Sequence, residues 1–162
     1  MLKVLFVCLG NICRSPTAHG VFEHALAASD LAGQVEVDSA GTGDWHIGRA
    51  PDQRAQAAGK ARGYSLGSLR ARQVVPDDFM TFQHVLAMDH SNLHDLLSLS
   101  GTGAPGASGV AAQPRLFLQG VPEMDVLDVP DPYQGGEADF ERVIDLIERG
   151  VDHLIASIVR DA

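Results

Sequence analysis

The chain has 162 residues, 45% of them hydrophobic and 20% charged, which suits one compact domain with a buried core and excludes a disordered chain. Twelve Lys and Arg against 21 Asp and Glu give a net charge of −9, which argues against a general nucleic-acid binder because such proteins need a basic face. Two cysteines exclude a disulfide scaffold and a four-thiolate zinc site. No apolar run approaches the roughly 20 residues of a membrane span, so we expect a cytoplasmic protein with free thiols.

Short β-rich apolar runs alternate with helical patterns along the chain. The predicted strands are residues 2–7, 35–39, 85–88 and 116–118. The first of them, LKVLFV, is apolar enough to be buried on both faces of a parallel sheet. Because strands that alternate with helices are typical of parallel sheets, the sequence predicts an α/β sandwich.

The predicted helices are bounded by capping residues and glycines. Ser15 as N-cap and Pro16 at the first helical position begin the first helix, and Gly33 ends it. Further helices are predicted over 51–62 and 91–99. The last helix is long and amphipathic, with an apolar stripe that we interpret as core packing: Phe140, Val143, Ile144, Ile147, Val151, Leu154, Ile155 and Ile158.

Residues 101–114 are small and rich in Gly and Ala, which predicts a flexible surface loop. It is not expected to link two domains, because the chain that follows is too short to fold alone, so residues 1–162 are expected to form a single domain. The loop contains a G-x-G-x-x-G pattern, but that pattern follows a predicted helix and includes a proline. We therefore reject it as a dinucleotide site.

The segment CLGNICRS connects the first predicted strand to the first predicted helix, where ligands of open α/β sheets bind. Backbone N–H groups of a tight loop and the positive end of the following helix can hold an anion there. Gly10 and Asn11 accept the left-handed backbone that such a loop needs, and the planar guanidinium of Arg14 matches two phosphate oxygens. We therefore predict a phosphate-binding loop of Leu9, Gly10, Asn11, Ile12, Cys13, Arg14 and Ser15.

Cys8 stands at the start of this loop, next to the predicted helix N-terminus and Arg14. Such surroundings favour the thiolate form of a cysteine, so we expect Cys8 to be a thiolate at neutral pH and a nucleophile toward phosphorus. The Ser15 hydroxyl would stabilise the thiolate by donating a hydrogen bond. The alternative interpretation is a buried structural cysteine in a turn that binds no phosphate.

Several longer segments carry a family resemblance: VCLGNICRSPTA around Cys8, DSAGTGDWHIGRAPD (38–52), ARQVVPDDF (71–79), LAMDHSNL (86–93), DFERV (139–143) and the tripeptide DPY that begins at Asp131. With these segments the chain resembles the low-molecular-weight protein tyrosine phosphatases over nearly its whole length, apart from 101–114. The resemblance implies a four-stranded parallel sheet flanked by helices on both faces, with the catalytic loop between the first strand and the first helix. It also implies hydrolysis of phosphotyrosine monoesters through a phosphocysteine, without a cofactor.

The same resemblance assigns roles to single residues. It makes Cys8 the nucleophile, Arg14 the phosphate clamp and Asp131 the general acid and base. Chemistry independently asks for an acid because the tyrosine leaving group has a pKa of about 10, although the sequence alone does not choose Asp131 over Asp128. The resemblance also makes Trp45 and Tyr133 the aromatic walls of the substrate pocket.

Residues around this core are assigned less directly. Asp89, after the third predicted strand, is expected to orient the loop. The family often has an acidic residue where this chain has His19 and a histidine where it has Leu69, so the support of the loop is expected to differ here. Gln134 replaces a second aromatic residue and makes the pocket rim less apolar. Four arginines are candidates to rim the pocket: Arg49, Arg54, Arg70 and Arg72.

Cys13 has two open interpretations. It either captures oxidised Cys8 in a reversible disulfide or fills a small buried space. His90 and His94 have metal-ligand spacing on a helix, but no third ligand accompanies them, so we expect no metal site.

Three alternatives remain beside the tyrosine phosphatase. An arsenate reductase needs further redox cysteines, and a protein arginine phosphatase typically has Thr where this chain has the apolar Ile12. A catalytically silent phosphoprotein-binding module would not need Cys8, Arg14 and Asp131 together. The expected partners are phosphotyrosine proteins, with a tyrosine kinase as one candidate, and a monomer is favoured.

Overall fold

The computed structural model describes residues 1–101 and 112–162. Most of the loop expected at 101–114 therefore lies outside the described residues. In chain order the elements are β1 (Leu2–Cys8), α1 (Arg14–Ala27), β2 (Val35–Gly41), α2 (Gln53–Ala61), α3 (Asp78–Thr81), β3 (His84–Ala87), α4 (His90–Ser100), β4 (Arg115–Leu116) and α5 (Glu137–Asp161).

The four strands form one parallel sheet in the order β2-β1-β3-β4. This confirms the expected α/β fold with a four-stranded parallel sheet. β1 is apolar throughout because it lies between β2 and β3, and its residues from Val4 to Cys8 are all buried. Val4 pairs with Val37 on one side and with His84 on the other, which fixes the register of the centre of the sheet.

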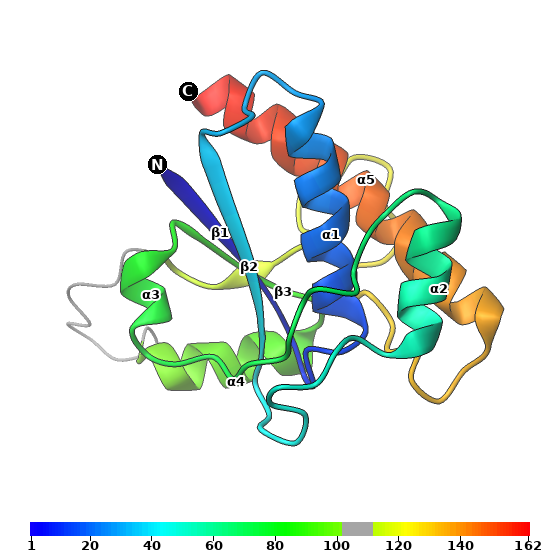
Figure 1. The fold of residues 1–162 in the computed structure, drawn as a ribbon. Helices are drawn as coiled ribbons and strands as arrows, with labels where there is room; N and C mark the ends of the chain where they lie inside the picture. The colour runs from blue at the N-terminus through cyan, green and yellow to red at the C-terminus, as the bar shows by residue number, and fades with distance from the viewer. Residues whose placement is uncertain (102–111) are drawn as a thin grey trace.

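Helices cover both faces of the sheet, as expected (Figure 1). Val4 and Phe6 of β1 join the cluster on the side of α1 and α5, where the Phe6 ring meets the rings of Phe22 and Phe117 edge-on at centroid distances of 5.6 and 5.3 Å. Leu5 and Val7 point the other way, into the cluster that α3 and α4 close. The predicted apolar stripe of α5 is confirmed as core packing, since most of it is buried in the first cluster.

Several predicted helix boundaries are wrong. α2 begins at Gln53, because the Asp52 side chain accepts from the Arg54 N–H as N-cap, rather than at residue 51. α1 begins at Arg14 with Cys13 as N-cap, and the Ser15 side chain bonds within the loop instead of capping the helix. α1 ends at Ala27 rather than Gly33, because the Ser29 hydroxyl donates to the Leu26 carbonyl and accepts from the Leu31 N–H, which turns the chain early. α4 begins one residue before Ser91, because the carboxylate of Asp89 accepts from the Asn92 N–H at 2.7 Å.

A helix that crosses a bilayer needs roughly 20 apolar residues. Neither 1–101 nor 112–162 contains a helix with the length and apolar character needed to cross a bilayer.

Candidate active site

The candidate site lies where three strands end at one edge of the sheet. Cys8 is the last residue of β1, Gly41 is the last residue of β2, and Asp89 follows β3 closely. The connection from β1 runs to β2 on one side, whereas the connection from the neighbouring β3 runs to β4 on the other side. The edge between β1 and β3 is therefore the topological switch point at which open α/β sheets bind ligands. A cavity of about 190 Å³ opens here, and Cys8 and Arg14 both line it.

The Cys8 sulfur is held by two groups of its own loop. The Asn11 backbone N–H donates to Sγ at 3.3 Å, and the Ser15 hydroxyl lies 3.0 Å from Sγ. The Asn11 side-chain amide donates to Ser15 Oγ at 2.8 Å, so the acceptor side of that hydroxyl is engaged. The hydroxyl hydrogen then has two acceptors in reach, Cys8 Sγ at 3.0 Å and the Ala40 carbonyl at 3.4 Å.

The loop backbone takes the conformation that its sequence predicts. Asn11 has a φ of 57°, in the left-handed region that Asn tolerates better than most residues. Gly41 of β2 backs the loop so closely that an added Cβ would lie 2.6 Å from the Leu9 carbonyl oxygen and 3.2 Å from the Asn11 nitrogen. A side chain at position 41 would therefore push the loop out of place.

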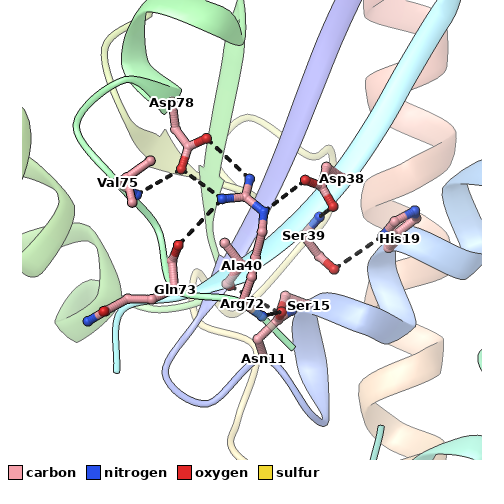
Figure 2. A network of polar contacts seen from close by, with 10 residues as sticks. All are labelled: Asn11, Ser15, His19, Asp38, Ser39, Ala40, Arg72, Gln73, Val75 and Asp78. Carbon is pink, nitrogen blue, oxygen red and sulfur yellow. Dashed lines mark hydrogen bonds and ion pairs between the residues drawn. The ribbon is translucent and has the colours of Figure 1, made fainter. Parts of the chain in front are cut away.

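A polar network behind the loop fixes the Asn11 side chain (Figure 2). Asn11 Oδ1 accepts from the Arg72 backbone N–H at 3.0 Å, which settles the orientation of its amide. The Arg72 side chain is itself held by carboxylates on two elements, with Nε donating to Asp38 at 2.9 Å and Nη1 donating to Asp78 at 3.0 Å. Arg72 thus connects the loop to β2 and to the start of α3, and nothing in its sequence position marked it as a support.

Arg14 is almost fully buried, at 3% exposure, and is aimed by two contacts. Its Nη1 donates to Asp89 Oδ2 at 2.6 Å and to the Val129 carbonyl at 2.9 Å. Burial lowers the pKa of the guanidinium, but Cys8 and Asp89 outweigh burial and the net pKa is raised. Arg14 Nη2 lies 3.8 Å from Asp131 Oδ2, and Asp131 lines the cavity.

The cavity brings together the predicted residues that come from distant parts of the chain. Asp131, Trp45 and Tyr133 all line it beside the loop residues. Asp131 Oδ1 accepts from the Tyr133 N–H at 3.0 Å, which orients the carboxylate. Trp45 and Tyr133 are 66% and 47% exposed, as expected for walls at the mouth of a pocket.

His46 also lines the cavity, although the sequence analysis did not select it. Its position next to Trp45 was the one available signal. Asn11 and Ser15, by contrast, are absent from the lining of this cavity in the described part of the chain, and act on the Cys8 sulfur from behind.

Cys13 differs from Cys8 in its surroundings. It packs in a small cluster with Ala55 and Phe140, and its pKa is raised to about 12 by burial and, to a smaller extent, by the negative charge of Asp52. Both cysteines are free thiols.

The two departures from the family pattern have different outcomes. His19 is buried and holds Ser39 of β2 through Nδ1 at 3.1 Å and Glu23 of its own helix through Nε2 at 3.0 Å. Leu69 lies in a turn, where its N–H donates to the Leu66 carbonyl at 3.1 Å. In this chain the Arg72 backbone N–H holds Asn11, and His19 contacts Ser39 of the neighbouring strand.

The four candidate rim arginines do not line this cavity within the described residues, so that expectation is corrected. Arg72 is drawn behind the loop by Asp38 and Asp78. Arg70 donates to the carbonyls of Gly67 and Leu69, and Arg49 is exposed. Arg54 lies across the segment that follows Asp131.

His90 and His94 do not form a pair. His90 Nδ1 contacts Asp128 at 2.6 Å instead. Among residues 1–101 and 112–162 no group of three or more potential metal ligands comes together.

Comparison with known proteins agrees with this geometry. The family model described as low molecular weight phosphotyrosine protein phosphatase matches residues 3–162. The low molecular weight protein-tyrosine-phosphatase YfkJ of Bacillus subtilis is 41% identical over 161 residues, which cover 99% of this chain and 98% of that protein. The low molecular weight phosphotyrosine protein phosphatase of Homo sapiens is 40% identical over 141 residues, or 87% of this chain and 85% of that protein.

Solved structures are similar over the same length. The crystal structure of YfkJ matches with a TM-score of 0.89 and 40% identity, covering 99% of this chain and 96% of that one. The crystal structure of a drosophila arginine phosphatase matches with a TM-score of 0.88 at 28% identity, covering 97% of this chain and 98% of that one.

Proposed function

The chain belongs to the low molecular weight phosphotyrosine protein phosphatase family and is a hydrolase of phosphotyrosine, and from that premise we propose that Cys8, Arg14 and Asp131 carry the reaction. Cys8 is the nucleophile, Arg14 the phosphate clamp, and Asp131 the general acid and base. The backbone N–H groups of residues 9–15 bind the phosphate oxygens. Trp45 and Tyr133 stack on the phenol ring.

In the first step the Cys8 thiolate attacks phosphorus. The S–P bond forms while the bond from phosphorus to the tyrosine oxygen breaks. Asp131 transfers its proton to that departing oxygen, which lowers the barrier because a phenolate is a poor leaving group. Arg14 and the helix N-terminus stabilise the charge that builds on the phosphate oxygens.

In the second step a water molecule hydrolyses the phosphocysteine. Asp131, now a carboxylate, takes a proton from the water as its oxygen bonds to phosphorus. The S–P bond breaks, inorganic phosphate leaves, and the thiolate is restored. Asp131 ends the cycle protonated and ready for the next substrate.

The observation that carries this proposal is the cluster around one sulfur. Cys8 Sγ lies within hydrogen-bond distance of Ser15 Oγ and the Asn11 N–H, and it shares a cavity with Arg14 and Asp131. Two interpretations involve no catalysis: a structural cysteine and a silent phosphoprotein-binding module. Neither of them requires an acid and a buried cation together at one cavity.

The test is a covalent trap. Rapid acid quenching during turnover of a phosphotyrosine peptide should yield a phosphoenzyme whose modification maps to Cys8 by mass spectrometry. Cys8→Ser should abolish hydrolysis and the trapped species while phosphate binding persists. Turnover in Cys8→Ser equal to that of the parent would refute the covalent mechanism.

The choice of phosphotyrosine over phosphoarginine follows from the apolar side of the cavity. Ile12 lines it and offers no hydrogen bond to a guanidinium, whereas an aromatic ring packs against it well. The trapping experiment therefore uses a phosphoarginine peptide as its second substrate, and a higher kcat/KM for that peptide would overturn the substrate choice.

We further propose Cys13 as the redox partner of Cys8. After a peroxide converts Cys8 to a sulfenic acid, the Cys13 sulfur attacks it, a disulfide forms and water leaves. The support is proximity, since both cysteines line the same cavity. The raised pKa of Cys13 makes this capture slower than that by an ordinary thiol.

The remaining assignments concern the setting of the enzyme. Phosphotyrosine proteins are proposed as substrates, the monomer as the working form and the cytoplasm as its location. Residues 1–162 are proposed to form one phosphatase domain.

A further inference from the structure

Arg54, near the start of α2, bridges two parts of the site that are far apart in sequence. Its Nη2 donates to the Tyr133 carbonyl at 2.9 Å, and its Nη1 donates to the Gly135 carbonyl at 3.2 Å. These two carbonyls belong to the short segment that follows Asp131. The guanidinium therefore binds the backbone of the segment that carries Asp131.

The other edge of the guanidinium is anchored to Asp52, the N-cap of α2. Arg54 Nε donates to Asp52 Oδ1 and Nη2 donates to Asp52 Oδ2, both at 3.1 Å. The Asp52 backbone N–H donates to the Ile12 carbonyl at 2.8 Å. A continuous path thus leads from the phosphate-binding loop through Asp52 and Arg54 to the Asp131 segment.

Two aromatic rings hold the guanidinium plane. It lies 4.7 Å from the ring centroid of Phe140, which is buried at the start of α5, and 5.6 Å from that of Tyr133. A lysine in this place would keep the charge but lacks the planar fork that reaches two carbonyls and a carboxylate at once. The geometry is thus specific to arginine.

The link to Asp131 runs through the Tyr133 peptide groups. Tyr133 donates its N–H to Asp131 Oδ1 at 3.0 Å and offers its carbonyl to Arg54 at 2.9 Å. If Arg54 releases the carbonyl, the N–H that orients the carboxylate moves with the segment. Asp131 has no comparable enclosure of its own, because its side chain is 49% exposed.

We propose that Arg54 is a positioning residue for the general acid, holding the Asp131 segment in register with the phosphate-binding loop. The inference rests on the proposed role of Asp131. Within the described residues Arg54 does not line the cavity, and it acts through the placement of the carboxylate.

The test compares leaving groups, because only an acid-dependent step is sensitive to the acid. Arg54→Ala and Arg54→Lys should each lower kcat/KM for a phosphotyrosine peptide by about tenfold. For an aryl phosphate with an acidic nitrophenol leaving group, kcat/KM should change by less than about twofold, because that group departs without a proton. If both variants keep the parent's ratio of kcat/KM between the two substrates, the proposal is overturned.

Arg62 supplies the matched control. At the far end of α2 it bridges to α5 in a similar way, with Nη1 to Glu148 at 2.6 Å and to Asp145 at 2.7 Å, and Nη2 to the Glu141 carbonyl at 3.4 Å. Arg62→Ala should therefore leave kcat/KM for both substrates unchanged. An equal loss in Arg62→Ala would mean that Arg54 acts through general stability, which also overturns the proposal.

Asp131→Asn separates failure of this inference from failure of the proposed function. If Asp131→Asn lowers kcat/KM equally for the phosphotyrosine peptide and for the nitrophenyl ester, Asp131 is not the acid, and both proposals fail together. If it does, Arg54→Ala/Asp131→Asn should be no slower than Asp131→Asn alone, because the two residues act in one path. A further tenfold loss in the double variant would show that Arg54 acts independently and would overturn the positioning role alone.

Discussion

Cys8 and Cys13 share one short loop, but their neighbours give them different chemistry. Cys8 lines the cavity beside Arg14 and lies 3.0 Å from the Ser15 hydroxyl. Cys13 lines the same cavity but packs against Ala55 and Phe140, and burial together with Asp52 raises its pKa to about 12. Since only the thiolate reacts with electrophiles, the two positions should differ widely in reactivity.

Alkylation measures this difference directly. At pH 8 a thiol with a pKa of about 12 is ionised to roughly 10⁻⁴, so iodoacetate should modify Cys8 and spare Cys13. The Cys13 thiolate fraction grows only as the pH rises toward 12. Peptide mapping by mass spectrometry over time reads out both rates, and inorganic phosphate should slow the labelling of Cys8. Equal rates at the two cysteines would contradict the assignment of their environments.

At this scale residue chemistry alone predicted the contiguous loop, whereas Asp131, Trp45 and Tyr133 were found only through the family resemblance. Cys8, Arg14 and Ser15 occur within one octapeptide, so their proximity follows from chain geometry. The Val129 carbonyl and the Arg72 backbone N–H are brought in from distant segments. Main-chain groups of this kind carry no residue signature, so no pattern in the sequence could have selected them.

α5 packs tightly against the ring of Phe117 at Gly150. A Cβ added there would lie 2.5 Å from Cζ of Phe117. The Phe117 ring is buried and itself packs against Phe6 of β1. The glycine therefore lets the longest helix approach the sheet more closely than any side chain would permit.

Gly150→Ala tests this approach, because two effects oppose each other there. Alanine favours the helix by up to about 1 kcal/mol, but overpacking a rigid ring costs about 1–3 kcal/mol. We expect a net loss of up to about 2 kcal/mol in the free energy of unfolding, measured by urea titration, with kcat/KM for aryl phosphates unchanged. Phe117→Leu in the same chain should recover part of the loss. A stabilised Gly150→Ala would show that α5 has room at this point.

Element types were predictable from the sequence, while several of their ends were not. Apolar runs such as LKVLFV announce buried strands because both of their faces must be covered. The starts of α1 and α4 were misplaced because Ser15 and Ser91 are good caps in isolation. In the fold, Ser15 turns to the Cys8 sulfur, and the carboxylate of Asp89 caps α4 one residue earlier. Competition between tertiary partners, rather than local propensity, decides these ends.

The molecule as a whole carries a net charge of −9, while its substrate is an anion. Attraction is therefore local, since Arg14 and the N-terminus of α1 act within the cavity, and the rest of the surface repels at longer range. Peptides that carry positive charge beside the phosphotyrosine should approach fastest.

Two matched phosphotyrosine peptides test this effect, one flanked by lysines and one by glutamates. At low ionic strength kcat/KM should be higher for the lysine peptide by several-fold, and the ratio should shrink toward one near 0.5 M salt, because screening shortens the reach of surface charge. A ratio that is near one already at low salt would show that the net charge of the molecule has no part in substrate choice.

The start of α1 has a consequence for how quickly the enzyme can work. Within the described chain, the Cys13 side chain makes no hydrogen bond to the first turn of α1, and an uncapped helix N-terminus attracts any oxyanion. That affinity does not distinguish the incoming ester from outgoing orthophosphate. Orthophosphate in a cell would accordingly inhibit turnover, and the same affinity that favours substrate binding also slows the release of the phosphate product.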